Sequence, residues 1–200
     1  MNAALQRLAG LGLALLCGSA AGEAVKYEID PAHTFPSFEV SHLGFSVHRG
    51  RFNATRGTLI LDRAARRGEL QVVIDTASID TGQEALEKAL RSESFFDVAK
   101  FPEMRFQSSR LEFDGERISA VHGTLTIKGV ARPLSLKIDH FHCGRQFLQP
   151  RPVCGANASA RLLRSEFGID KYVSLGLGDE VRIAIQVEVL GELAEAGPAN

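Results

Sequence analysis

Polar and apolar residues alternate along most of this chain, and this pattern limits what the chain can fold into. In the stretch 181–189 every second residue is Val or Ile, and the residues between them are mostly polar. Successive side chains of an extended strand point to opposite faces, so a period of two predicts a strand with one buried face. We expect further strands of this kind at 25–29, 38–42, 45–48, 58–62, 69–79, 104–113 and 156–164.

The stretch 121–143 contains two alternating runs on either side of a turn. Gly129 permits positive φ and Pro133 cannot donate to a strand ladder, so we place the turn between residues 128 and 133. If Leu125 then faces Leu136, the apolar residues of both runs share one face. The stretch therefore predicts a β-hairpin with a single apolar face.

One segment interrupts the alternation. Residues 83–91 carry a narrow apolar stripe at helical spacing, which predicts a short helix suited to covering one end of a sheet or barrel. The rest gives eight or more strands that we expect to be antiparallel. Such a set either closes into a barrel or stacks as two sheets, and the pattern alone leaves both open. An eight-stranded barrel has no exposed edge and has room for one small ligand.

The first residues differ in composition from the rest. Arg7 precedes an apolar run that is too short to span a bilayer, and small residues follow it, so we expect residues 1–24 to be a cleaved signal peptide. A lipid anchor at Cys17 and a buried N-terminal helix are the alternatives. Residues 25–190 would form one domain, and the small, polar residues 191–200 a disordered tail.

The cysteine count agrees with export. Loss of Cys17 with the leader leaves Cys143 and Cys154, an even pair that predicts a disulfide in an oxidising compartment such as the periplasm. So short a closed loop would stabilise the fold by about 3 kcal/mol. Two free thiols, or a metal site shared with His140 and His142, are the alternatives.

Charge and motifs exclude some functions. The chain has 23 Lys and Arg against 24 Asp and Glu and lacks a basic stripe, so we expect no nucleic-acid partner. It contains no G-x-S-x-G elbow, no H-E-x-x-H helix and no phosphate-binding glycine loop. Its carboxylates form no evident acid/base pair, and we therefore expect no enzyme.

Several short stretches, taken in order, resemble the YceI-like family of lipid- and polyisoprenoid-binding proteins over most of residues 25–190. They are Asp30-x-x-His33-Thr34 with Phe38-x-Val40-x-His42, Gly50-x-Phe52 with Gly57, Leu90-x-Ser92-x-x-Phe95-Phe96-Asp97 with Phe101-Pro102, Gly123-x-Leu125-Thr126-Ile127-x-Gly129 with Pro133, and Arg164-Ser165-x-Phe167-Gly168. Thr34 stands where relatives often have serine, which keeps the hydroxyl group.

The resemblance implies an elongated, antiparallel, eight-stranded, lipocalin-like barrel. Its lumen would hold a long-chain lipid such as an isoprenoid quinone or a polyprenyl compound, and no other cofactor would be required. The expected function is that of a periplasmic lipid carrier. The alternative is a redox or stress accessory that docks on a membrane protein of the cytochrome b561 type, and a homodimer stays open.

The expected ligand-binding residues lie on the apolar faces and at their ends. They are Phe38, Val40, His42, Phe45, Val47, Phe52, Phe95, Phe96, Met104, Phe106, Leu125, Leu136, Ile138 and His140. The same side chains could instead fill a solid core, since small barrels are often packed. His140 and His142 continue the inward face unless a bulge at Phe141 turns them out. A His-x-His pair could also bind a metal, although we expect none.

Overall fold

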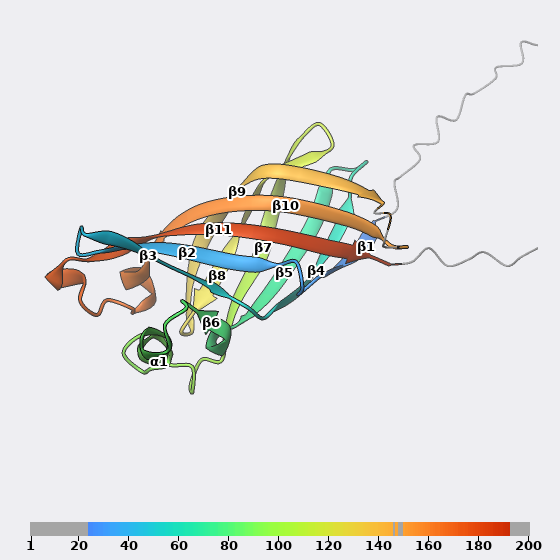
Figure 1. Cartoon of the computed structure of the whole chain (residues 1–200). Helices are drawn as coiled ribbons and strands as arrows, with labels where there is room; N and C mark the ends of the chain where they lie inside the picture. Colours follow the sequence, from blue (N-terminus) through green and yellow to red (C-terminus); the bar gives the residue numbers. More distant parts are fainter. Residues whose placement is uncertain (1–23, 146, 148–149, 193–200) are drawn as a thin grey trace, which may run out of the picture.

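The structure is a computed structural model that describes residues 24–145, 147 and 150–192 (Figure 1). The strands are β1 (Val25–Ile29), β2 (Phe35–His42), β3 (Ser46–Phe52), β4 (Thr55–Asp62), β5 (Arg67–Asp75), β6 (Ile79–Asp80), β7 (Glu103–Asp114), β8 (Arg117–Ile127), β9 (Val130–Arg145), β10 (Pro152–Leu163) and β11 (Leu177–Gly191). The helix is α1 (Glu84–Arg91), and three 3₁₀ turns are η1 (Thr76–Ser78), η2 (Arg164–Phe167) and η3 (Val173–Leu175). The expected leader lies outside these residues except for its last one, and so does most of the expected tail.

Eight strands form a closed ring. They follow the order β1-β4-β5-β7-β8-β9-β10-β11, and β11 pairs again with β1, with every pairing antiparallel. Closure satisfies the backbone groups that an open sheet would leave at its edges. The predicted eight-stranded barrel with one short helix is therefore confirmed, and the sandwich is excluded.

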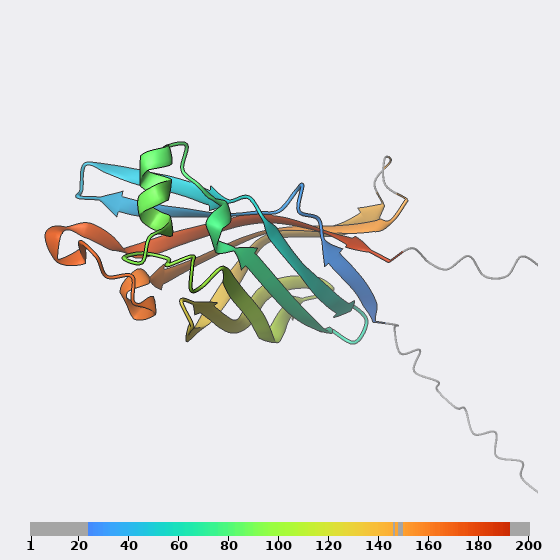
Figure 2. The same cartoon turned by 90° about the horizontal axis from the view of Figure 1, so that it is seen from below.

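The barrel is extended at one end. The last part of β11, 189–191, pairs with β1, whereas 177–186 of the same strand pairs with β2. The β2–β3 hairpin therefore lengthens the wall beyond the ring, and β6 pairs with β3 at its margin. Helix α1 and the chain after β10 lie at this end, while β1 lies at the other (Figures 1 and 2). Gly191 is the last residue of β11 and pairs with Tyr27, so the barrel includes the first residue of the expected tail.

The register expected for the 121–143 hairpin is wrong. Lys128 and Gly129 both have positive φ, at 50° and 75°, and together make a two-residue turn whose twist matches that of the strands. Leu136 consequently lies opposite Val121 and not opposite Leu125. The displacement is an even number of residues, so both strands still turn their apolar faces to the same side.

The predicted disulfide is confirmed. Cys143 and Cys154 are bonded and lie opposite each other on β9 and β10. Phe147 lies between them in the sequence. Because both thiols are used, the alternatives of free thiols and of a metal site with cysteine ligands are wrong.

In the described part of the chain, no helix has the length and apolar character needed to cross a membrane.

Candidate functional site

A cavity of about 680 Å³ fills the interior of the barrel. Its wall is made of the inward-facing apolar side chains of the strands, and α1 with the loop after it contributes Leu86, Leu90, Phe95 and Phe96. Cavities that bind small molecules measure about 300–1,000 Å³, whereas a packing defect of about 150 Å³ is already unusual in a core. The alternative of a solid core is therefore wrong, and the space has the size of a ligand site.

Eleven of the fourteen expected residues line this cavity. They are Phe38, Val40, His42, Phe52, Phe95, Phe96, Met104, Phe106, Leu125, Leu136 and Ile138. They come from β2, β3, β7, β8 and β9 and from the loop after α1, so stretches far apart in the sequence meet around one space. Contact of any of them with a ligand stays a prediction.

Phe45 and Val47 were expected to line the cavity and do not. Phe45 is 89% exposed at the β2–β3 tip and Val47 is 43% exposed on the outer face of β3. The tip is a turn in which Leu43 and Gly44 both have positive φ, and His42 pairs with Ser46 across it. This turn shifts the alternation of β3 by one residue relative to our expectation, so the even-numbered residues face inward.

His140 also lies outside the lumen. The β9–β10 register jumps between the pairs of Asn157 with His140 and of Ala158 with Ile138, which leaves Asp139 as an extra residue. One inserted residue reverses the faces that follow it, so Phe141 lines the lumen and His140 faces an outer groove. A bulge is therefore present, but it lies at Asp139 and not at Phe141, where the sequence left one open.

The outer groove gathers several titratable side chains. His140 and His142 line it together with His33 and Glu188. Asp30, His33 and Glu188 also place ligand-type atoms within 4.8 Å of one another. Asp30 and His33 are already hydrogen-bonded to each other, because His33 Nδ1 lies 2.7 Å from the Asp30 carboxylate. This hydrogen bond lowers the pKa of Asp30 and raises the pKa of His33. The Asp30–His33 hydrogen bond stabilises the turn between β1 and β2. This structural role explains the Asp-x-x-His motif.

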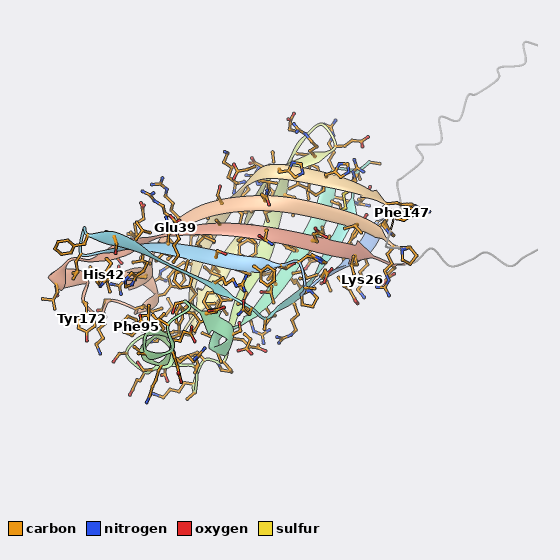
Figure 3. The ribbon with its side chains drawn as sticks, viewed as in Figure 1. Lys26, Glu39, His42, Phe95, Phe147 and Tyr172 are labelled. Carbon is orange, nitrogen blue, oxygen red and sulfur yellow. A yellow bond between two sulfur atoms is a disulfide. The ribbon has the colours of Figure 1, made fainter. Side chains whose placement is uncertain are left out.

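Most polar side chains that line the cavity lie at its mouth, the end of the barrel near His42 and Tyr172 (Figure 3). The rings of His42 and His48 stack with centroids 4.1 Å apart, and burial, followed by the proximity of His42, lowers the pKa of His48. Lys171 Nζ lies 5.1 Å from the centroid of the Tyr172 ring and 5.9 Å from that of Phe95. Figure 3 shows His42, Phe95 and Tyr172 together at one end of the barrel. The deep part of the lumen is apolar, and its hydrogen-bonding groups lie mainly at this end.

Arg164 organises the chain beside the mouth. Its buried guanidinium donates to the carbonyl oxygens of Ile169 and Gly178, both at 2.7 Å, and of Lys171 at 3.0 Å. Asp179 accepts hydrogen bonds from the backbone N–H and the hydroxyl group of Ser165. The Arg-Ser-x-Phe-Gly motif is thus the base of the loop that presents Tyr172 at the mouth.

Two glycines of the stretches that resemble the family are explained by packing. A Cβ on Gly50 would lie 2.5 Å from Cζ of Phe38, and one on Gly123 would lie 2.6 Å from Cζ of Phe106. In both places a phenylalanine ring of the neighbouring strand covers the glycine. The absence of a side chain lets these two rings lie flat along the wall of the lumen.

Sequence reasoning missed part of the lining. The clearest omissions are the inward residues of β5 and β11, namely Leu70, Val72, Ile74, Val181, Ile183, Ile185 and Val187. Their alternation was the strongest in the chain and could have identified them. The mouth residues Lys171, Tyr172 and Leu175 lie in an irregular segment, where no periodicity indicates a facing direction.

Comparison with known proteins shows similarity to this chain in sequence and in fold. A family model described as the YceI-like domain matches residues 27–189. A UPF0312 protein of Yersinia pestis (strain Pestoides F) is 37% identical over 134 residues, which cover 65% of this chain and 69% of the relative. A UPF0312 protein of Pseudomonas savastanoi pv. phaseolicola is 38% identical over 130 residues, covering 64% and 67%.

Solved structures share the fold. BcnA of Burkholderia cenocepacia matches with a TM-score of 0.69 and 22% identity over 80% of this chain and 98% of that one. The YCEI protein of Campylobacter jejuni gives 0.63 and 25%, covering 76% and 90%. A polyisoprenoid binding domain from Saccharophagus degradans gives 0.60 and 16%, covering 83% and 98%.

Proposed function

The chain belongs to the YceI-like family, and from that premise we propose that it binds a long-chain apolar lipid in its barrel lumen. The proposed ligand class is a polyisoprenoid or an isoprenoid quinone, and the proposed role is that of a carrier in the periplasm. The disulfide and the expected leader agree with an oxidising, exported location. The Saccharophagus degradans domain, which has the same fold, is a polyisoprenoid binding domain, and this supports the ligand class.

The observation that carries the proposal is the shape and chemistry of the cavity. It is a single space of about 680 Å³ lined by apolar side chains from strands all around the barrel and by α1. Transfer of about ten methylene groups from water into such a space contributes roughly 8 kcal/mol before ordering costs. A flexible apolar chain suits a lumen without deep polar anchors, and the polar groups at the mouth suit its headgroup.

We infer binding without catalysis. The titratable side chains that line the lumen lie mainly at its mouth, and the deep wall offers no acid/base pair among the described residues. A lipid carrier needs an apolar lumen and an opening through which the lipid enters, but no catalytic group.

The test is to identify what the purified protein contains. The full chain would be expressed with export, purified without detergent and examined by native mass spectrometry, followed by organic extraction. We expect a stoichiometric long-chain lipid. If the lumen contains no lipid and the protein takes up no polyprenyl compound or quinone, the proposal is wrong.

A pair of variants on one strand sharpens this test. Ile185 lines the lumen, whereas its neighbour Ala184 is exposed on the outer face of β11. We expect Ile185→Trp to reduce the bound lipid or to select a shorter chain, because the indole occupies lumen volume. Ala184→Trp should leave the ligand unchanged. Equal ligand content in both variants would place the lipid outside the lumen. The accessory alternative stays a prediction, to be tested by recovery of a membrane protein with the exported chain.

A further inference from the structure

We propose that the mouth of the barrel docks on the surface of a lipid bilayer through an apolar rim. The mouth rim consists of Leu43, Phe45 and Val47 from the β2–β3 tip and of Tyr172 and Leu175 from the η3 loop. The proposal deepens the proposed function, because it names the surface from which the cavity would take up its lipid and to which it would deliver it.

The first observation is exposure. Phe45 is 89% and Leu175 is 71% exposed, and the other three residues are each between 43% and 48% exposed. Isolated exposed apolar residues are common on soluble proteins, but contiguous groups of large ones indicate an interaction site. These five belong to only two short segments.

The second observation is that the two segments touch. Leu177, at the start of β11, pairs with His42, at the end of β2, so the η3 loop lies beside the β2–β3 tip. A Cβ on Gly176 would lie 3.6 Å from Cδ2 of Leu43. The exposed residues therefore form one apolar surface made of two adjoining loops.

The third observation is that this surface continues into the lumen. Leu43, Tyr172 and Leu175 are exposed and also line the cavity, whereas Phe45 and Val47 project outside it. An apolar chain could therefore pass from a bilayer into the barrel along these apolar side chains, while its headgroup stays beside the polar groups of the mouth. This continuity favours a bilayer over a protein as the occupant.

The neighbouring side chains suit the interface between water and lipid. Lys171 donates to Ser94 Oγ at 3.1 Å and lies over the rings of Tyr172 and Phe95, and within the described residues it has no carboxylate partner. Tyrosine and lysine are favoured at headgroup level, where an apolar body meets a polar tip. Lys171 is thus placed to meet a lipid phosphate.

Leu43 and Tyr172 adopt positive φ, at 55° and 65°. Arg66, Asp97 and Lys128 do the same elsewhere, so this conformation belongs to tight turns in general. At the rim the turns hold two apolar side chains at the edge of the mouth.

The decisive variant is Phe45→Ser, because Phe45 is exposed, lies at the tip of the rim and does not line the cavity. Phe147→Ser is the matched control, since Phe147 is fully exposed at the opposite end of the barrel (Figure 3). Lipid-loaded protein would be floated with vesicles of phosphatidylethanolamine that contain phosphatidylglycerol as the minority lipid. We expect Phe45→Ser to reduce the vesicle-bound fraction about tenfold, Phe45→Ser with Leu175→Ser to reduce it further, and Phe147→Ser to have no effect.

Two further measurements separate the explanations. Native mass spectrometry reports the bound lipid, which Phe45→Ser should leave in place. If protein that holds no lipid still binds vesicles through the rim, the docking proposal is supported and the proposed lipid-binding function is rejected. The docking proposal is overturned if the wild-type chain does not float, or if the two single variants lose binding equally. It is also overturned if Phe45→Ser converts a dimer to a monomer in sedimentation without vesicles, because the rim would then join two copies.

Discussion

Arg164 concentrates more polar contacts than any neighbouring side chain, and they go to backbone carbonyl groups of the loop before β11 and of the first two residues of β11. A planar guanidinium can serve several carbonyls at once, which a lysine ammonium cannot do with the same geometry. The loop from η2 to β11 has short-range backbone hydrogen bonds of its own, such as those from the Val173 N–H to the Asp170 carbonyl and from the Leu177 N–H to the Tyr172 carbonyl. Arg164 adds longer-range contacts to these turns and so helps to fix Tyr172 and Leu175 at the mouth.

We predict that Arg164→Met lowers the free energy of unfolding by about 3 kcal/mol, because it leaves buried carbonyls without a donor. Arg164→Lys should lose roughly half as much. The measurement is urea unfolding, together with hydrogen exchange of 169–177, which should speed up in both variants. Arg161→Met is the control, since Arg161 is exposed three residues earlier and forms its ion pair with Glu180 on the surface. Equal effects at 161 and 164 would contradict the anchoring role.

The Asp30–His33 pair predicts a window of pH dependence. The lowered pKa of Asp30 gives a contribution to stability that is fully present above pH about 3.9. This contribution is lost as the pH falls through the lowered pKa. The raised pKa of His33 gives a contribution to stability that is complete below pH about 6.5 and is lost as the pH rises through the raised pKa. The stability difference between the wild-type chain and His33→Gln should therefore be largest between about pH 4 and pH 6.5. Urea unfolding across pH measures it. A difference that does not decrease below about pH 4 and above about pH 6.5, or that persists in the Asp30→Asn background, would contradict it.

At the scale of the element, alternation identified which strands exist and where their apolar faces lie. It placed Met104 and Phe106 in β7 and Leu136 and Ile138 in β9 on the lumen side. It failed where one residue shifts the phase, at the β2–β3 turn and at the bulge near Asp139. Gly44 is compatible with turns of several lengths, and His140 and His142, which follow Asp139, suit either face, so neither shift leaves a mark on the pattern. The pairing of strands distant in sequence decides both.

The β9–β10 end of the barrel should depend on its disulfide. We predict that Cys143→Ser with Cys154→Ser lowers the free energy of unfolding by about 3 kcal/mol, because the unfolded chain regains the freedom of the closed loop. Cys154 is buried, so repacking of its serine adds to this loss. Urea unfolding of oxidised and reduced wild-type protein measures the same quantity, and the double variant should not respond to reductant. Cys154 lines the lumen, but serine is close to it in size, and Phe147, between the two cysteines, lies at the end opposite the mouth (Figure 3). Lipid content should therefore persist in the variant. Loss of the lipid together with the disulfide would show that the two ends are coupled.

For the whole molecule, the cavity takes the place that a packed core has in other small domains. The ring of hydrogen-bonded strands can persist without contents, but the lumen wall then lacks partner atoms for dispersion contacts. A lipid that binds only the folded chain adds about 2.7 kcal/mol at roughly a hundredfold excess over Kd. For a chain of this length we predict that removal of the lipid lowers Tm by roughly 5–10 °C.

Calorimetry of loaded protein, of protein stripped by organic solvent and refolded, and of protein reloaded with a polyprenyl compound measures this difference. The far-ultraviolet circular dichroism of the stripped form should match that of the loaded form, because the backbone pairing does not involve the ligand. Reloading should restore Tm, and chains too short to fill the lumen should restore less of it. In Ile185→Trp the indole already fills part of the space, so the gap between loaded and stripped protein should narrow. A stripped protein that unfolds at the same temperature as the loaded one would mean that the lumen wall collapses onto itself, and the lipid would then be no part of the core.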